Sequence, residues 1–229
     1  MNKRKYHEEL LAIMEKNRAA GIFPRVLLHS CCAPCSSYCI ELLAQGFYVT
    51  VFYYNPNIYP DGEYLHRVRE QERFIDEFSR DVIKRPDYSE TYPAGFYADF
   101  IEGDFEKDRF YTEVARGLED EPERGRRCEK CFDLRLSETA KRAKADGYDY
   151  FCTTLTISPQ KDPILLNTIG ERLSAEYGVP FLPSEFRKCE GYKRSTGISR
   201  EYGMYRQDYC GCVYSYHARH GGEPVGKDD

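Results

Sequence analysis

Seven of the ten cysteines in this 229-residue chain stand in three tight clusters that are far apart in the sequence. The clusters are Cys31-Cys32-Ala-Pro-Cys35, Cys128-Glu-Lys-Cys131 and Cys210-Gly-Cys212. In a reducing compartment, cysteine pairs at such spacings bind metals or act in redox chemistry more often than they form disulfides. Because one metal site can use all three clusters only if folding brings them together, the clusters constrain the fold as well as the chemistry.

The clustered thiols outnumber the ligands of one tetrahedral zinc ion or of one four-iron cluster. Two Cys-x-x-Cys pairs together supply four thiolates, namely Cys32, Cys35, Cys128 and Cys131. The remaining clustered thiols form a possible second set of three, namely Cys31, Cys210 and Cys212. Three protein ligands leave one coordination position open, which is typical of a catalytic metal. The spacing predicts metal binding and leaves both iron and zinc open.

Charge and hydropathy indicate the setting in which the protein works. The formal net charge of −5 argues against a surface that grips nucleic acid everywhere, although basic residues gather near the second and third cysteine clusters. No run approaches the roughly 18 consecutive apolar residues of a membrane span, and no apolar signal core follows the basic N-terminus. We therefore expect a cytoplasmic protein that does not associate with membranes.

Alternating apolar and helical patterns predict an α/β fold in one catalytic domain, 1–229, with an N-terminal helix inside 1–22 and a flexible tail at 221–229. The expected strands are 25–30, 48–54, 81–85, 150–156 and 180–182, and the expected helices are 5–20, 36–46, 61–79, 132–146 and 163–177. This order implies a mostly parallel, Rossmann-like sheet with helices on both faces.

Ligands of such sheets bind outside the carboxyl ends of the strands. The first cysteine cluster, residues 55–57, Asp87 and residues 157–161 all follow an expected strand. The helix expected after the first cluster would favour thiolates at its N-terminus. We therefore expect a cysteine-rich metal site at this edge of the sheet.

Four separated motifs lie between residues 25 and 216. They are His29-Ser-Cys-Cys-Ala-Pro-Cys35, Cys128-Glu-Lys-Cys-Phe-Asp-Leu-Arg-Leu136, Thr153-Thr-Leu-Thr-Ile-Ser-Pro-Gln-Lys161 and Tyr209-Cys-Gly-Cys212. In this order they resemble the cobalamin-independent epoxyqueuosine reductases of the QueH type. The resemblance implies removal of the epoxide oxygen from epoxyqueuosine at the wobble position of certain tRNAs, which gives queuosine. It also implies a four-iron, four-sulfur cluster with a single iron nearby, on a fold related to nucleotide-binding alpha hydrolases.

The resemblance turns the two thiol sets into specific expectations. We expect the iron-sulfur cluster on Cys32, Cys35, Cys128 and Cys131. We expect the adjacent mononuclear iron on Cys31, Cys210 and Cys212. Asp87 and Tyr209 are candidate proton donors by their position.

The tRNA would bind through basic residues while the wobble base is extruded toward the metals. The residues expected to contact RNA are Lys161, Arg126, Arg127, Lys130, Lys193, Arg194 and Arg206. Electrons would come from a donor such as a ferredoxin or a flavodoxin.

Two other readings of the motifs are open to test. An ATP-using tRNA thiolase or ligase with a structural zinc is disfavoured, because Ser30-Cys-Cys-Ala-Pro-Cys35 stands where such enzymes carry a Ser-Gly-Gly-x-Asp-Ser type of loop. A non-enzymatic zinc module that binds RNA would need four thiolates, and three clustered thiols would then have no use.

Overall fold

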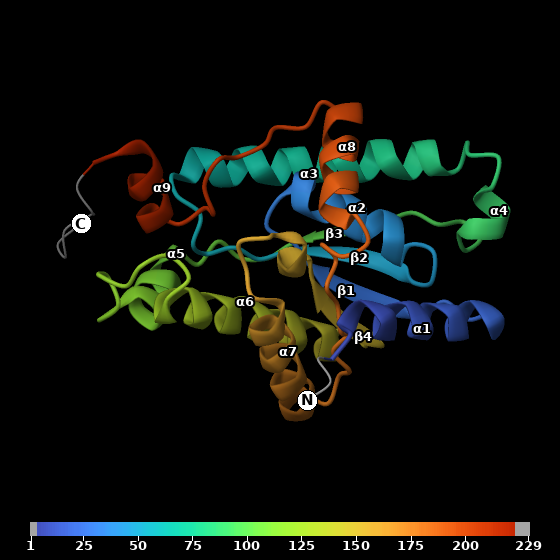
Figure 1. The fold of residues 1–229 in the computed structure, drawn as a ribbon, viewed down its shortest axis with the longest axis horizontal. Helices are drawn as coiled ribbons and strands as arrows, with labels where there is room; N and C mark the ends of the chain where they lie inside the picture. The colour runs from blue at the N-terminus through green and yellow to red at the C-terminus, as the bar shows by residue number, and fades with distance from the viewer. Residues whose placement is uncertain (1–3, 223–229) are drawn as a thin grey trace.

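Four parallel strands form one sheet in the order β3-β2-β1-β4 in the computed structural model, which describes residues 4–222 (Figure 1). The strands are β1 (Arg25–His29), β2 (Tyr48–Tyr53), β3 (Asp99–Glu102) and β4 (Tyr150–Thr153). The helices are α1 (Tyr6–Ala19), α2 (Ala33–Leu43), α3 (Asp61–Val82), α4 (Tyr88–Thr91), α5 (Lys107–Arg109), α6 (Arg126–Ala145), α7 (Pro163–Tyr177), α8 (Gly191–Glu201) and α9 (Val213–His220). A π-helical turn, Phe110–Ala115, continues α5, and a 3-10 turn, Thr154–Ile157, follows β4.

Two apolar cores lie on opposite faces of the sheet, because side chains alternate along each strand. Val26 and Leu28 of β1 pack in the core that α1, α2, α3 and α8 close. Leu27 packs in the other core, which α6 and α7 close. Figure 1 shows α2, α3 and α8 on one side of the sheet and α6 and α7 on the other. The expected α/β fold, a parallel sheet flanked by helices, is confirmed.

The strand order determines where the first cysteine cluster lies relative to the sheet. From β1 the chain proceeds to β2 and β3 on one side, and α6 then leads back to β4 on the other side of β1. In parallel sheets the carboxyl ends beside such a reversal frame a crevice that binds ligands. The first cysteine cluster follows β1, and the 3-10 turn and Lys161 follow β4. Both segments therefore reach the crevice.

Local signals explain several element boundaries. The carboxylate of Asp162 accepts a hydrogen bond from the Ile164 amide at 2.8 Å, and Pro163 occupies the first turn of α7. Gly178 ends the same helix with a left-handed φ of 73°, which glycine adopts at little cost. The expected helix 163–177 therefore matches α7, because local residues signal both its start and its end.

The expected strand at 81–85 is wrong. Residues up to Val82 belong to α3, in which Phe74, Phe78 and Val82 are all 0% exposed and recur every four residues. This helical repeat continues the buried stripe of α3, so helical packing prevails over the short apolar run. The third strand is instead the acidic segment Asp99–Glu102, which pairs with β2.

Asp87 does not follow a strand at the carboxyl edge of the sheet, which was the reason to consider it as a proton donor. It precedes the short helix α4, is exposed, and its carboxylate accepts a hydrogen bond from the Thr91 hydroxyl at 3.2 Å. Figure 1 shows α4 and α9 at opposite ends of the molecule, and α9 directly follows the third cysteine cluster. We therefore withdraw Asp87 as a proton donor.

Three other expectations concern a short strand, the start of a helix and the C-terminal tail. Phe181 forms a single bridge with Phe151 rather than a strand. Helix α6 begins at Arg126, six residues before the expected start, so it includes the second cysteine cluster. Most of the expected tail at 221–229 lies outside the described residues.

Among residues 4–222, no helix combines the length and the apolar composition needed to cross a bilayer.

Candidate metal centre

The first cysteine cluster brings three sulfur atoms together at the N-terminus of α2. The Sγ atoms of Cys31, Cys32 and Cys35 all lie within 4.8 Å of one another, and those of Cys31 and Cys32 are 4.0 Å apart. Three thiolates on one tetrahedral metal ion lie about 3.8 Å apart, as follows from metal–sulfur bonds of about 2.3 Å. The three thiols therefore converge closely enough to share one metal centre.

Two amide side chains hold this cluster in place, the buried Gln71 and the half-buried Gln207. Gln71 of α3 accepts hydrogen bonds from the hydroxyls of Ser30 and Ser36, at 2.8 and 3.0 Å, on either side of the cluster. Gln207 donates through Nε2 to the Sγ atom of Cys32 at 2.8 Å. Hydrogen bonds of this kind orient metal ligands and tune the metal. The cysteine turn is thus anchored to α3 and to the segment before the third cluster.

The three thiols have different proton affinities. Hydrogen bonds from the Cys32 and Cys35 thiols hold the pKa of Cys31 well below its usual value, and the charge of Lys161 acts in the same direction. Burial raises the pKa of Cys32 to about 12, and the hydrogen bond that Cys35 donates to Cys31 raises the pKa of Cys35. The cluster therefore favours one shared thiolate, and a metal that takes all three sulfurs displaces the remaining protons.

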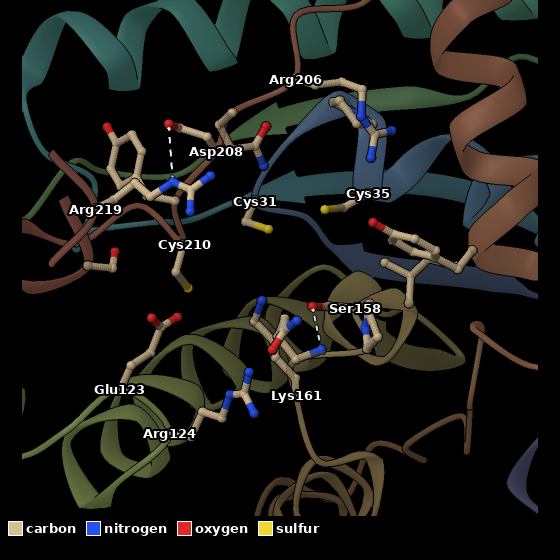
Figure 2. Close-up of a pocket in the computed structure, with 18 of the residues that line it drawn as sticks. Cys31, Cys35, Glu123, Arg124, Ser158, Lys161, Arg206, Asp208, Cys210 and Arg219 are labelled. Carbon is tan, nitrogen blue, oxygen red and sulfur yellow. Dashed lines mark hydrogen bonds and ion pairs between the residues drawn. The ribbon is translucent and has the colours of Figure 1, made fainter.

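The second and third clusters lie beside the first. Cys128 and Cys131 are in the first turns of α6, and Cys210 and Cys212 precede α9. Burial raises the pKa of Cys131 to about 12, and charge on Cys210, Cys212 and Cys128 acts in the same direction. Figure 2 shows Cys31, Cys35 and Cys210 around one cavity. The first and third clusters therefore line one cavity, and the second cluster packs in the same apolar core as the first.

The expected division of the thiols into two ligand sets stays a prediction. Among residues 4–222, Cys31, Cys32 and Cys35 are the one group of three potential ligands within 4.8 Å of one another. The Sγ atom of Cys128 accepts the backbone N–H of Arg124 at 3.2 Å, and that of Cys212 accepts the N–H of Ser215 at 3.5 Å.

The cavity beside the cysteines has a volume of about 490 Å³. Cys31, Cys35 and Cys210 contribute sulfur to its wall, and Lys161 lies among them. Its remaining charged lining residues are Glu123, Arg124, Arg206, Asp208 and Arg219. The cavity thus combines thiols with a mainly cationic lining.

The cationic side chains near the cysteines, Arg135 and Lys161, indicate whether a negatively charged metal–thiolate centre fits this site. Arg135 is 1% exposed, and its Nη2 atom has no hydrogen-bond partner among residues 4–222. Neither Arg135 nor Lys161 forms an ion pair within the part of the chain that the structure describes, residues 4–222. A buried cation requires compensation, and a centre with several thiolate ligands supplies negative charge. All-sulfur ligands suit zinc or iron-sulfur centres rather than magnesium or calcium, so the residues fit the expected cofactor class.

The residues expected to bind RNA occupy different environments. Lys161 and Arg206 line the cavity. Arg127 is only 4% exposed, and its Nη1 atom donates to the carbonyl oxygens of Leu118 and Glu119 at 2.8 and 3.0 Å. Because its guanidinium is used inside the protein, Arg127 is removed from the RNA-contacting set.

The other four of these residues lie outside the cavity lining. The guanidinium of Arg194 forms two hydrogen bonds with Glu41 of α2. Arg126 and Lys193 are exposed and form ion pairs with Glu121 and Glu190. Lys130 is exposed on α6.

Tyr209 lines the cavity, but its hydroxyl donates to the carbonyl oxygen of Tyr59. Burial raises the pKa of Tyr209, so the phenol keeps its proton at neutral pH. Its role as a proton donor stays a prediction.

Sequence reasoning missed two buried arginines, Arg67 and Arg135. Arg135 follows Cys131 by four residues, so their shared helix face was a signal that could have identified it. Arg67 is distant from every cluster in the sequence and carried no such signal.

Comparison with known proteins identifies the family. The family model described as epoxyqueuosine reductase QueH matches residues 26–218. The chain belongs to the epoxyqueuosine reductase QueH family. QueH relatives from Staphylococcus epidermidis and Streptococcus pyogenes are 39% and 40% identical to it, over 92% and 91% of this chain and 84% and 75% of the relatives. A QueH relative from Thermotoga maritima is 36% identical over 83% of this chain and 89% of its own length. The resemblance carried by the four motifs is confirmed.

Proposed function

We propose that this chain is an oxidoreductase that removes the epoxide oxygen of epoxyqueuosine in the anticodon wobble position of tRNA and gives queuosine. Membership of the epoxyqueuosine reductase QueH family carries this proposal. The reaction consumes two electrons and two protons and releases water. Converging thiols beside a cationic cavity support it, because they suit a redox metal next to a site for an anionic polymer.

The cofactors we propose are a four-iron, four-sulfur cluster and a mononuclear iron. When bound, they would supply single electrons and an open coordination position that polarises the epoxide oxygen. The cluster ligands proposed are Cys32, Cys35, Cys128 and Cys131. The ligands proposed for the single iron are Cys31, Cys210 and Cys212. Cys31 lies beside Cys32 and Cys35, so in this proposal it joins the two metal centres.

The chain's own groups would bind and orient the modified nucleoside. Lys161 lies among the thiols rather than at an exposed surface, and charge on Cys210 and Cys31 raises its pKa against the opposing effect of burial. It therefore stays protonated beside the reacting end of the substrate. This position suits a hydrogen bond to the departing oxygen better than a contact with the RNA backbone.

The cationic lining would hold the anticodon loop. Arg124 and Arg206 are exposed and belong to the cavity lining, as does Tyr192, which is 44% exposed. Arginines pair with phosphates, and an exposed tyrosine ring can stack on an unpaired base. Arg124→Ala and Arg206→Ala should each weaken tRNA binding and reduce its salt dependence by about 0.7 in the log–log slope. An unchanged slope in both variants would place the RNA elsewhere.

We place the reaction in the cytoplasm, with a ferredoxin or a flavodoxin as the electron donor. Cysteine clusters that bind metal rather than form disulfides are typical of a reducing compartment.

Metal analysis and turnover test the proposal together. Protein purified without oxygen should contain iron and acid-labile sulfide, and with a low-potential reductant it should convert epoxyqueuosine in tRNA to queuosine. Stoichiometric zinc without sulfide would contradict the iron assignment and would favour the thiolase or zinc-module readings. An unchanged epoxide in the presence of an intact iron-sulfur cluster would reject the function.

Single replacements test the proposed division of thiols. Cys210→Ala and Cys212→Ala should keep most of the cluster absorbance and lose turnover. Cys189→Ala is the matched control, because Cys189 is exposed and lies outside the clusters. Loss of the cluster itself in the first two variants would show that the ligand sets are divided differently.

A further inference from the structure

Two buried arginines approach the cysteines from opposite faces of the sheet. Arg67 belongs to α3 and Arg135 to α6, and each is 1% exposed. Figure 1 shows α3 and α6 on opposite sides of the sheet. A buried guanidinium is strongly destabilising unless negative charge and hydrogen-bond acceptors compensate it. Their surroundings therefore indicate what compensates each charge.

Arg135 has hydrogen-bond acceptors, but within the described residues no carboxylate pairs with it. Its Nε atom donates to the carbonyl oxygen of Cys131 at 3.1 Å, and its Nη1 atom donates to the side-chain oxygen of Asn55 at 3.4 Å. Its Nη2 atom is buried and has no partner among residues 4–222. Arg135 therefore contacts the second cysteine cluster directly, and a metal–thiolate group there would supply the negative charge that its buried guanidinium requires.

Arg67 reaches the third cluster in a similar way. Its Nε atom pairs with Glu63 at 2.7 Å, and its Nη1 atom donates to the carbonyl oxygen of Cys210 at 3.4 Å. Its Nη2 atom is also buried without a partner in the described chain. A Cβ atom on Gly211, which has a φ of 131°, would lie 3.1 Å from Nη1 of Arg67. The glycine between Cys210 and Cys212 therefore makes room for the guanidinium.

We propose that Arg67 and Arg135 are the internal counter-cations of the metal centre, fixing the backbone of the third and second cysteine clusters while offsetting the charge of the metal–thiolate group. They are positioning residues, because they act through the cysteines and not on the substrate. The inference rests on the proposed function in one respect, namely that the thiols hold a metal. It extends that function by assigning the control of metal retention and reduction potential to two helices outside the cysteine motifs.

The charge argument predicts opposite effects with and without metal. One-electron reduction adds negative charge to the centre, so a nearby buried cation favours the reduced form. Without metal, the cation of Arg135 has only the partly ionised thiols as counter-charge. Replacement by an uncharged side chain should therefore harm the loaded protein and spare the metal-free one.

The test compares Arg135→Met and Arg67→Met with their lysine counterparts. Each protein is reconstituted without oxygen with ferrous iron and sulfide, and its midpoint potential and its rate of iron loss to a ferrous chelator are measured. Arg135→Met should shift the one-electron reduction equilibrium at least tenfold toward the oxidised form, which is about 59 mV. It should also lose iron at least tenfold faster, whereas Arg135→Lys should show smaller changes because it keeps the charge.

Arg73→Met is the matched control. Arg73 lies on the same helix as Arg67, and its ion pairs are with Glu70 and Glu77 rather than with groups near the cysteines. Its potential and iron loss should match those of the unmodified protein. Metal-free Arg135→Met should melt no lower than the metal-free unmodified protein, a result that a merely structural arginine would not produce.

Several outcomes would overturn the proposal. Unchanged potential and unchanged iron loss in Arg135→Met and Arg67→Met would do so, as would an equal change in Arg73→Met. If the methionine variants do not fold, Arg135→Lys and Arg67→Lys provide the same comparison, and potentials identical to the unmodified protein would then reject the role. If the unmodified protein binds zinc and no sulfide, the proposed function fails, and the rate of zinc loss in the same variants decides the counter-cation role separately.

Discussion

The ion pair between Arg194 of α8 and Glu41 of α2 leads to a prediction about stability rather than about RNA binding. Two hydrogen bonds join the guanidinium to the carboxylate, at 2.8 and 2.7 Å. The Glu41 side chain is 12% exposed and that of Arg194 is 38% exposed. The carboxylate is therefore largely buried, whereas the guanidinium is open to water.

The expected magnitude follows from this partial exposure. A hydrogen bond to a buried charged group contributes about 1.5–3 kcal/mol, and an exposed ion pair contributes about 0–1 kcal/mol. Because water screens the exposed guanidinium, we expect a coupling of about 1 kcal/mol. Arg85 lies 3.6 Å from the same carboxylate, so Glu41 keeps a cationic neighbour when Arg194 is replaced. This limits the penalty in the single variant.

A double-mutant cycle measures the coupling. Urea unfolding of the metal-free protein, Arg194→Met, Glu41→Gln and the double variant gives the four free energies of unfolding, and tRNA affinity is measured against salt concentration for the same proteins. The salt slope should stay unchanged, whereas loss of a phosphate contact would change it by about 0.7–0.9. Lys144→Met is the control, because Lys144 is exposed on α6 and is not among the residues expected to contact RNA. A coupling below about 0.3 kcal/mol together with a reduced salt slope in Arg194→Met would refute the structural role.

Three further predictions follow from the packing and the charges. Gly191→Ala should destabilise the protein by about 1–3 kcal/mol, because the new Cβ atom would lie 1.9 Å from the carbonyl oxygen of Phe186. The control is Gly197→Ala in the same helix, whose new Cβ atom meets nothing nearer than 4.0 Å. Thermal unfolding should show this control to be neutral or stabilising. Burial lowers the pKa of His29 from 6.5 to about 3, so the unfolded chain binds the extra proton between these values. Stability should therefore fall by up to about 1.4 kcal/mol per pH unit as the pH drops below 6.5, and His29→Gln should flatten that part of the acid-unfolding curve. Removing the metal from the loaded protein should lower its melting temperature, and a melting temperature that does not depend on metal would contradict a centre that joins the three clusters.

Local sequence patterns predicted those parts of the fold that local forces decide. β1 and β2 are buried apolar runs, and α7 carries its own start and stop signals in Asp162, Pro163 and Gly178. The errors occur where contacts with residues distant in the sequence decide the secondary structure. Residues 99–102 begin and end with an exposed acidic residue, and they become a strand because β2 offers a free edge to pair with. Residues 81–85 resemble a strand in isolation, but α3 continues its buried stripe through Val82.

The sequence by itself determined the family and the inventory of ligands, because thiols at fixed spacings and four ordered motifs are properties of the chain alone. Only the tertiary structure decided which thiols converge, that Arg127 points inward while Arg124 lines the cavity, and that Arg67 and Arg135 compensate the cysteines. The physical reason is that burial and electrostatic compensation depend on groups brought together across the sheet. For Arg67, the Cys210 carbonyl is 143 positions away in the sequence and 3.4 Å away in space.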